Sequence, residues 1–301
     1  MHIPLVDCDQ KKRGDAAIVA EIDRALRDCG FLSVTGLGLE SSAIDDIFQA
    51  SARFFSQDAS LKARCSYGSA EENFGYQALG AESLDPARPA DLKESFTMRN
   101  LLAAPIADGR WPDREFRDSV CSFYKRAWAA ASRLQRLLAI ALGLRPEFFV
   151  DCHSGENVTL RLLHYPAISD PALDDGQMGA GAHTDYGLLT LLIQDGVGGL
   201  QVRDAMGNWH DVPPRRSTIV VNSGDLLERW SNGRYRSTVH RVLPRRCATR
   251  RFSVALFVDP DSATEVEVLA SCVDDQHPAA YPRTTAGEHL TEKILATHRR
   301  P

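Results

Sequence analysis

From about residue 157 onward the chain is a series of short apolar runs rich in β-branched residues, broken by Gly, Pro and Asp. Short strands at fairly regular spacing, with turn residues between them, are typical of a β-sandwich or jelly roll. The strands that we expect cover residues 158–165, 188–194, 199–202, 218–222, 238–243 and 252–258.

The first half of the chain has a different pattern, with apolar residues at helical spacing. Helices are expected at 16–29, after an N-cap at Ser41 or Ser42 to about residue 55, at 114–142 and, near the end, at 286–297. Short strands are expected at 3–7 and 31–34, and irregular extended structure at 66–100. The predicted fold is α+β and β-rich: a double-stranded β-helix (jelly roll) core with flanking N-terminal and C-terminal helices.

We expect one domain, residues 1–301. A mainly helical region with short strands (1–156) precedes the jelly-roll core (157–260) and a C-terminal strand and helix (261–301). With 301 residues and 44% hydrophobic content, the chain can bury a large core.

Charge and cysteine content narrow the class of protein. The 35 Lys and Arg against 40 Asp and Glu give a formal net charge of −5, and no long basic run occurs, so no nucleic-acid partner is expected. Seven scattered cysteines without a Cys-x-x-Cys favour reduced thiols over a disulfide framework or structural zinc. No apolar run approaches the roughly 18 residues that a membrane span needs, and the start lacks an apolar signal region. We therefore expect a cytoplasmic protein with no membrane association.

The segment 181–192 places an imidazole and a carboxylate, His183 and Asp185, two residues apart before an apolar run. Side chains alternate along a strand, so both point to one side and can hold one metal ion. The third ligand must come from elsewhere, and His240 in the run 237–242 is the best candidate. Two histidines and one carboxylate that leave open positions suit non-haem Fe(II) used with O2.

A second candidate site is an Arg-x-Ser near the end of the β-rich region. Arg251 and Ser253 share a strand face, and a guanidinium with a hydroxyl is a good receptor for a carboxylate. A surface ion pair is the alternative for Arg251, since Arg245, Arg246 and Arg250 are close by. Arg250 is the alternative register, but the aromatic-then-Ser order of Phe252 and Ser253 favours Arg251.

These motifs, in this order, resemble the isopenicillin N synthase-like branch of the Fe(II)/2-oxoglutarate-dependent dioxygenase family. The resemblance runs through most of the chain. It rests on IPLVD (3–7), CGFL (29–32), LRLLHYP (160–166), the His183 segment, LIQD (192–195), GLQV (199–202), VNSGD (221–225), WSNGRY (230–235) and HRV (240–242).

The resemblance implies that His183, Asp185 and His240 bind Fe(II), and that Arg251 and Ser253, joined by Tyr165, grip the distal carboxylate of 2-oxoglutarate. It further implies oxidation of a small-molecule metabolite with O2, by hydroxylation, desaturation or cyclisation, with release of succinate and CO2. The Asp185 carboxylate favours these outcomes over halogenation. The family often has Asn where Leu163 stands, which leaves the details of 2-oxoglutarate binding open.

Substrate contacts are the least constrained part of the prediction. In the family the region 66–100 faces the substrate opening, so Phe74, Tyr76 and Phe96 are candidates for substrate contact, with ordinary aromatic packing as the alternative. Arg161 pairs either with an acidic substrate group or with an acidic side chain. The loop 169–181 is a candidate mouth or lid. The substrate and the oligomeric state are not encoded in any motif that we find.

Other functions remain open at this point. A same-fold oxidase that does not use 2-oxoglutarate, an ethylene-forming type of enzyme, and a non-catalytic metal-binding jelly roll are the alternatives. Asn222, Gly224 and Asp225 are expected to shape a turn. The remaining histidines are expected to be solvated: His153, His164, His210, His277, His289 and His298.

Overall fold

The computed structural model describes residues 1–301 except 86, 103–105, 168–175, 245–248 and 299–301. Two sheets dominate the described part of the chain. The larger runs in the order β1 (Leu5–Asp7), β2 (Phe31–Thr35), β10 (Ile219–Ser223), β7 (Leu189–Gln194), β12 (Arg251–Asp259), β5 (Asn157–Tyr165), β4 (Glu94–Arg99) and β3 (Gly75–Gln77). The smaller is β6 (Ala180–His183), β11 (His240–Val242), β8 (Leu200–Arg203) and β9 (Trp209–Asp211). A short pair, β13 (Glu265–Val266) with β14 (Thr284–Thr285), lies near the C-terminus.

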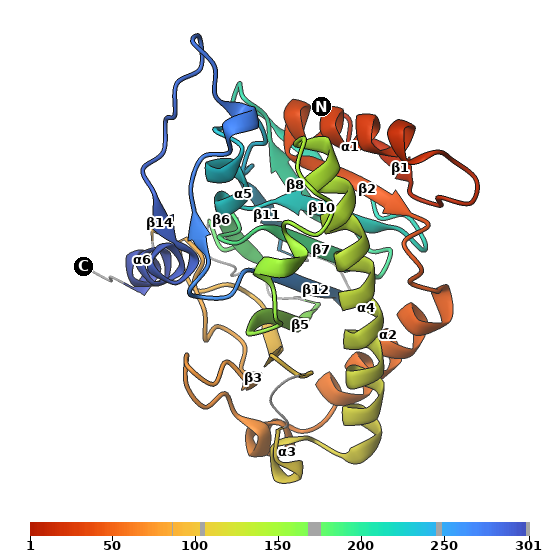
Figure 1. Ribbon diagram of the computed structural model, residues 1–301. Helices are drawn as coiled ribbons and strands as arrows, with labels where there is room; N and C mark the ends of the chain where they lie inside the picture. The colour runs from red at the N-terminus through yellow and green to blue at the C-terminus, as the bar shows by residue number, and fades with distance from the viewer. Residues whose placement is uncertain (86, 103–105, 168–175, 245–248, 299–301) are drawn as a thin grey trace.

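Helices cover the outer face of the larger sheet. They are α1 (Asp15–Cys29), α2 (Ser41–Phe55) and α4 (Arg114–Ala141). The short α3 (Ala59–Lys62) follows α2, and α5 (Asp225–Trp230) and α6 (Ala286–His298) come later in the chain. Figure 1 shows α4 running the length of the molecule alongside the strands, with α1 and α2 next to it. Asp113 begins α4 by accepting a hydrogen bond from the Phe116 amide.

Successive side chains of a strand point to opposite faces of the larger sheet, and they form two separate hydrophobic cores. On β12, Val254, Leu256 and Val258 pack outward against the helices. Ala255 and Phe257, between them, point inward and meet apolar residues of the smaller sheet such as Val202. The inner surface between the two sheets therefore carries the odd-numbered residues of β12 and β5, which pair in register.

Two glycines lie where separate backbone segments approach each other closely. Gly30 ends α1 in the left-handed conformation, with φ of 68°, and an added Cβ would lie 2.2 Å from the Arg236 carbonyl oxygen. An added Cβ at Gly224 would lie 2.2 Å from the Gly187 carbonyl oxygen. A side chain does not fit at either position, because another backbone segment already occupies the space.

The predicted jelly roll with N-terminal helices is confirmed, and the predicted helices and strands are present with shifts of one or two residues at most ends. Three expectations were wrong. Residues 180 and 181, expected at the end of a loop, belong to β6, and Asp225, expected to shape a turn, begins α5. Neither Ser41 nor Ser42 is the N-cap of α2, because the helix begins at Ser41 and Glu40 occupies the N-cap position. The segment 168–175 of the expected lid lies outside the described residues.

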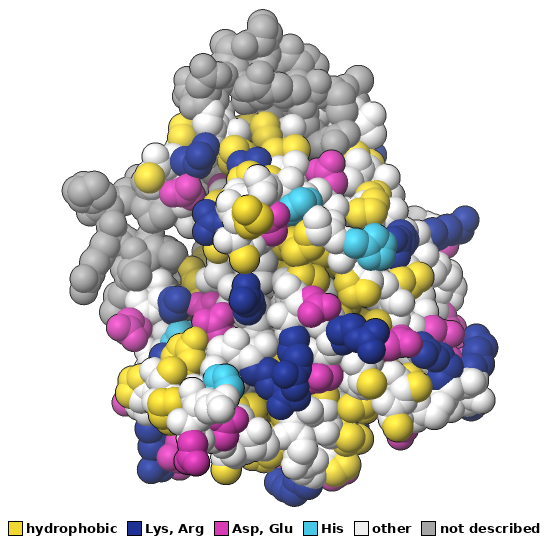
Figure 2. Space-filling model, turned by 90° about the horizontal axis from the view of Figure 1, so that it is seen from above, with side chains coloured by type: hydrophobic (Ala, Val, Ile, Leu, Met, Phe, Trp, Pro, Cys, Tyr) yellow, Lys and Arg dark blue, Asp and Glu magenta, His cyan; other side chains and the backbone are white. Residues whose placement is uncertain are grey.

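The face in Figure 2 mixes basic and acidic side chains. No helix in the described ranges combines the length and the apolar character that crossing a bilayer would require. The six described cysteines are free of disulfides, and Cys247 lies outside the described residues.

Candidate active site

Three predicted ligand residues meet between the two sheets. His183 ends β6 and His240 begins β11, and the two are direct partners in the antiparallel pairing of these strands. Their ring centroids lie 4.3 Å apart. Asp185 follows β6 and turns back toward both rings. Strand pairing therefore brings together residues that are far apart in the sequence.

The ligand atoms of the three side chains all lie within 4.8 Å of one another. The Asp185 Oδ1 atom is 3.7 Å from the Nε2 of His183 and 3.7 Å from the Nε2 of His240. These separations are too long for hydrogen bonds but allow all three atoms to reach one ion. Among the described residues this is the one such group of three.

Backbone carbonyls fix the orientation of both imidazoles. The Nδ1 of His183 lies 2.8 Å from the Gly181 oxygen, and the Nδ1 of His240 lies 3.1 Å from the Thr238 oxygen. A carbonyl only accepts, so each Nδ1 carries a proton, and Nε2 is the ring atom left to bind a metal. Burial, with His240 close by, lowers the pKa of His183 to about 3. This ring is therefore neutral, as a metal ligand must be.

The Asp185 carboxylate is held by its other oxygen. Its Oδ2 accepts hydrogen bonds from the Thr190 hydroxyl at 2.5 Å and the Asn222 amide at 2.7 Å. Burial alone would raise the pKa of Asp185, but the two histidines and these donors bring it below its ordinary value. Asn222 was expected to shape a turn. Instead it lies on β10 and orients this carboxylate, a role for which the sequence carries no local signal.

The segment that carries Asp185 is anchored to α5. The Asp225 amide donates to the Asp185 carbonyl oxygen at 2.8 Å, and the Asp225 carboxylate accepts from the Thr184 hydroxyl at 3.4 Å. Lys293 of α6 lies 2.6 Å from the same carboxylate. The C-terminal helix is therefore tied to the residue between two candidate ligands.

Arg251 lies on the same inner surface and is fully buried. Its guanidinium donates to Ser253 Oγ at 3.3 Å and to Gln194 Oε1 at 3.2 Å, and its Cζ lies 4.6 Å from the centre of the Tyr165 ring. The surface ion pair considered for Arg251 is thus excluded. Arg250 is exposed and bonds to Ser56 on the outer side, so Arg251, not Arg250, is the arginine that lies inside.

No carboxylate among the described residues pairs with Arg251, and its Nε has no hydrogen-bond partner there. A buried guanidinium without an anion is costly, because its desolvation is not offset by an opposite charge. The arrangement is suited to an anionic ligand that reaches the inner surface between the sheets.

Arg161 is also on the inner surface, two residues from Leu163 along β5. It forms an ion pair with Glu82 at 2.6 Å and donates to the hydroxyls of Ser95 and Thr97. Of the two interpretations offered for Arg161, the structure shows the ion pair with an acidic side chain. Nearby, Lys93 pairs with Asp91, whose other oxygen accepts from the Gly181 amide at 2.8 Å and so fixes the start of β6.

The three aromatic residues proposed for substrate contact lie on the outer side of the larger sheet, away from the candidate ligands. Phe74 and Phe96 are fully buried with Phe54, Trp111 and Phe116 in the outer core. Tyr76 donates to Glu94, again on the outer side. The structure corrects the expectation of substrate contact, because β4 pairs with β5 in the register that turns Ser95 and Thr97, not Phe96, toward Arg161.

The expectation of solvated histidines fails for three of the six. His164 is buried, bonds Glu94 at 2.7 Å and stacks on Phe55 and Phe252. His153 and His289 are buried as well. His277 is exposed, His210 is half-buried beside Asp204, and the side chain of His298 is not described.

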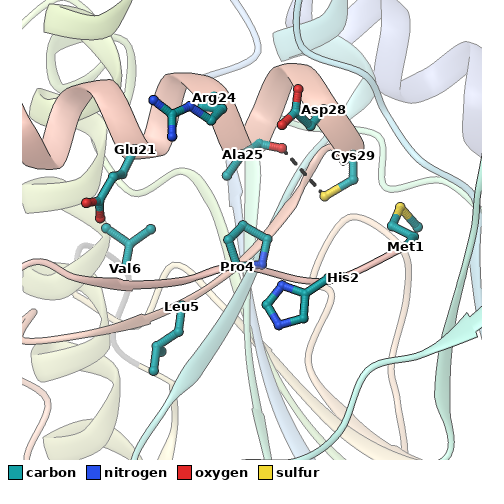
Figure 3. A pocket seen from close by; sticks show the side chains of 10 residues that line it. All are labelled: Met1, His2, Pro4, Leu5, Val6, Glu21, Arg24, Ala25, Asp28 and Cys29. Atoms are coloured by element: carbon teal, nitrogen blue, oxygen red, sulfur yellow. Dashed lines mark hydrogen bonds between the residues drawn. The ribbon is translucent and has the colours of Figure 1, made fainter.

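A surface pocket of about 560 Å³ lies between the N-terminal segment and α1, and its wall includes Arg24, Asp28 and Cys29 (Figure 3). Burial raises the pKa of the Cys29 thiol, which donates to carbonyl oxygens of Ala25 and Phe31. The lining includes none of the three candidate ligands, so this pocket is separate from the candidate active site.

Comparison with known proteins identifies the class. Residues 156–260 match the model of the 2OG-Fe(II) oxygenase superfamily, and residues 3–115 match that of the non-haem dioxygenase in morphine synthesis N-terminal region. The chain belongs to the 2OG-Fe(II) oxygenase superfamily. It is an Fe(II)/2-oxoglutarate-dependent oxidoreductase, and its cofactors are Fe(II) and 2-oxoglutarate.

Individual relatives extend over nearly the whole chain. The 2-oxoglutarate-Fe(II) type oxidoreductase ppzD of Metarhizium rileyi is 30% identical over 97% of this chain and 89% of its own. Homoarginine-6-hydroxylase 2-ODD-C23 of Glycine max is 32% identical over 94% and 89%. The crystal structure of a full-length Neurospora crassa protein in complex with alpha-KG and thymine matches with a TM-score of 0.87, at 31% identity, over 98% of this chain and 97% of that one.

Proposed function

We propose that this enzyme oxidises a small-molecule metabolite, by hydroxylation, desaturation or cyclisation, with release of succinate and CO2. His183, Asp185 and His240 bind the Fe(II), and Arg251, Ser253 and Tyr165 bind the distal carboxylate of 2-oxoglutarate. The observation that carries the proposal is the fully buried Arg251, without an acidic partner among the described residues, on the inner surface that also holds the three ligands.

The donor set fits the iron. Two imidazoles and one carboxylate would supply three ligands to Fe(II) and would leave positions for the co-substrate and for O2. The charges also fit, because Fe(II) and Arg251 together offset the Asp185 carboxylate and a dianionic 2-oxo acid. Bound Fe(II) supplies the redox chemistry with O2 and 2-oxoglutarate.

The protein residues supply position and protonation state. Gly181 and Thr238 hold the protons of the two histidines on Nδ1, and Thr190 with Asn222 keeps one oxygen of Asp185 turned toward the rings. Held in this way, the ligand atoms need little reorganisation when the metal binds, which favours a single geometry.

The substrate that fits best is a polar molecule without a large net charge. Between the two sheets, Arg161 is paired with Glu82 and Lys93 with Asp91, so the inner surface presents two compensated ion pairs. Lys93 lies close enough to His183 to lower its pKa. A compensated surface with hydroxyls of Ser95 and Thr97 is better suited to amide, hydroxyl or ring nitrogen groups than to a polyanion.

The first experiment is anaerobic addition of Fe(II) and 2-oxoglutarate, which should produce a visible charge-transfer absorbance. The second is a screen of amino acids, alkaloids and polyketides for substrate-dependent succinate release. A colourless anaerobic mixture would contradict the proposed ligand set. Substrate oxidation without succinate would indicate instead an oxidase of the same fold.

A further inference from the structure

Gln194, at the end of β7, lies beside Ser253 of β12 in the register of the larger sheet. Leu163 of β5 lies on the other side of the same serine. The candidate co-substrate serine therefore has an amide on one side and an apolar side chain on the other. All three side chains point to the inner surface between the sheets.

The orientation of the Gln194 amide is fixed by its neighbour. Its Oε1 accepts a hydrogen bond from Arg251 at 3.2 Å, and a guanidinium can only donate, so the opposite arrangement of oxygen and nitrogen is excluded. The Nε2 donor of Gln194 is buried and has no partner among the described residues. Leaving such a donor unpaired is unfavourable, because the desolvation of the amide is not compensated.

Three donors in this row have no acceptor among the described residues. They are the Nε2 of Gln194, the Nε of Arg251 and the hydroxyl hydrogen of Ser253, whose oxygen already accepts from Arg251. A carboxylate has two oxygens with about four acceptor positions, so one carboxylate can accept from several neighbouring donors.

We propose that Gln194 Nε2 donates to the distal carboxylate of 2-oxoglutarate, so that the polar contacts come from β7 and β12 while Leu163 closes the β5 side. The inference rests on the proposed function of Arg251 and Ser253. It assigns to Gln194 a role in co-substrate binding and explains how the site functions with an apolar residue at position 163.

The test is the Kd of 2-oxoglutarate, measured by anaerobic calorimetry on the Fe(II)-loaded protein. Gln194→Leu should raise this Kd about tenfold, the effect of losing one hydrogen bond to a charged group. The Kd of 2-oxopentanoate, which lacks the distal carboxylate, should not change. Gln194→Met, which keeps the length of the side chain, provides a second variant if the leucine protein folds poorly.

The second measurement asks whether a new amide at position 163, on the other side of Ser253, restores the affinity for 2-oxoglutarate. Leu163→Asn in the Gln194→Leu protein should restore most of the affinity, because it returns an amide donor to the row. If Gln194 only positioned Arg251 through Oε1, an amide at position 163 would not restore binding, and the proposal would be overturned. A Kd unchanged in both Gln194 variants would overturn it as well.

The matched control is Gln201→Leu. Gln201 also accepts from an arginine on the neighbouring strand, Arg241 at 2.8 Å, but on the outer side of the smaller sheet. The Kd of the Gln201→Leu protein for 2-oxoglutarate should equal that of the wild type. Failure of the wild type itself to bind 2-oxoglutarate would refute the proposed function, an outcome distinct from normal binding in the Gln194 variants.

Discussion

Asn222 donates a hydrogen bond of 2.7 Å to the oxygen of Asp185 that faces away from the two histidines. The other oxygen of Asp185 is thereby left on the side of the two rings, where it could bind a metal ion. The same division of roles applies to His183 and His240, where Nδ1 is bound to a carbonyl and Nε2 is free. Each candidate ligand has one atom held by the protein and one atom available.

Replacing Asn222 with Leu should weaken iron binding about 10- to 100-fold, as the loss of such supporting hydrogen bonds generally does. The carboxylate would keep only the Thr190 hydroxyl and would sample orientations that turn Oδ1 away from the rings. The measurement is anaerobic Fe(II) titration of the metal-free protein. Asn208→Leu, at an exposed turn beside Asp204, is the control. Equal iron affinity in both variants would show that Asn222 does not orient Asp185.

Arg251→Met should produce opposite effects on the free and bound protein. The free protein should be as stable as the wild type or more stable, because a buried cation without an anionic partner is replaced by an apolar side chain. The stabilisation that 2-oxoglutarate gives to the wild type should disappear, because a ligand stabilises only in proportion to its affinity. Thermal unfolding with and without 2-oxoglutarate measures both. A variant that is still stabilised by the ligand would contradict the assigned role.

Part of the candidate site could be predicted from the sequence because its signal is local. The two-residue spacing keeps His183 close to Asp185, and alternation along β12 turns Arg251 and Ser253 to one surface. His240 has no such local signal, because only the pairing of β11 with β6 brings it beside His183. The jelly roll could be predicted because short strands and turn residues are visible along the chain.

Features that depend on register between distant strands were not predictable. Phe96 and Tyr76 point outward only because β4 pairs with β5 at Phe96–Leu162, and nothing near Phe96 encodes that pairing. Asn222 supports Asp185 because β10 pairs with β7 at Asn222–Thr190. His164 is buried because its partner Glu94 is supplied by another strand. In each case the deciding contact crosses a long stretch of sequence.

His183→Ala should affect iron binding, whereas His164→Ala should affect the stability of the fold. His183→Ala, like Asp185→Ala, should abolish iron binding and turnover. His164→Ala should leave iron bound but reduce the free energy of unfolding by about 2 to 4 kcal/mol, because it removes a stacked ring and leaves Glu94 with one partner fewer. Iron content by metal analysis and unfolding in urea distinguish the two effects. Equal iron loss in the three variants would mean that the ligands are misassigned.

His153 makes the free protein sensitive to mild acid. Burial lowers its pKa from 6.5 to about 4, and its Nδ1 lies 2.5 Å from the Phe149 carbonyl oxygen. In the unfolded chain this histidine takes up a proton below about pH 6.5, while in the folded protein it remains neutral until about pH 4. The unfolded state therefore binds more protons than the folded state within this window. The free energy of unfolding consequently decreases as the pH falls.

The expected loss from His153 is up to about 3 kcal/mol between pH 6.5 and pH 4, from 1.36 kcal/mol per pKa unit. Urea unfolding of the metal-free protein at a series of pH values measures it. His153→Gln, which cannot titrate, should flatten this part of the profile, whereas exposed His277→Gln should leave the slope as in the wild type. A profile equally steep in both variants would show that other buried groups cause the acid sensitivity.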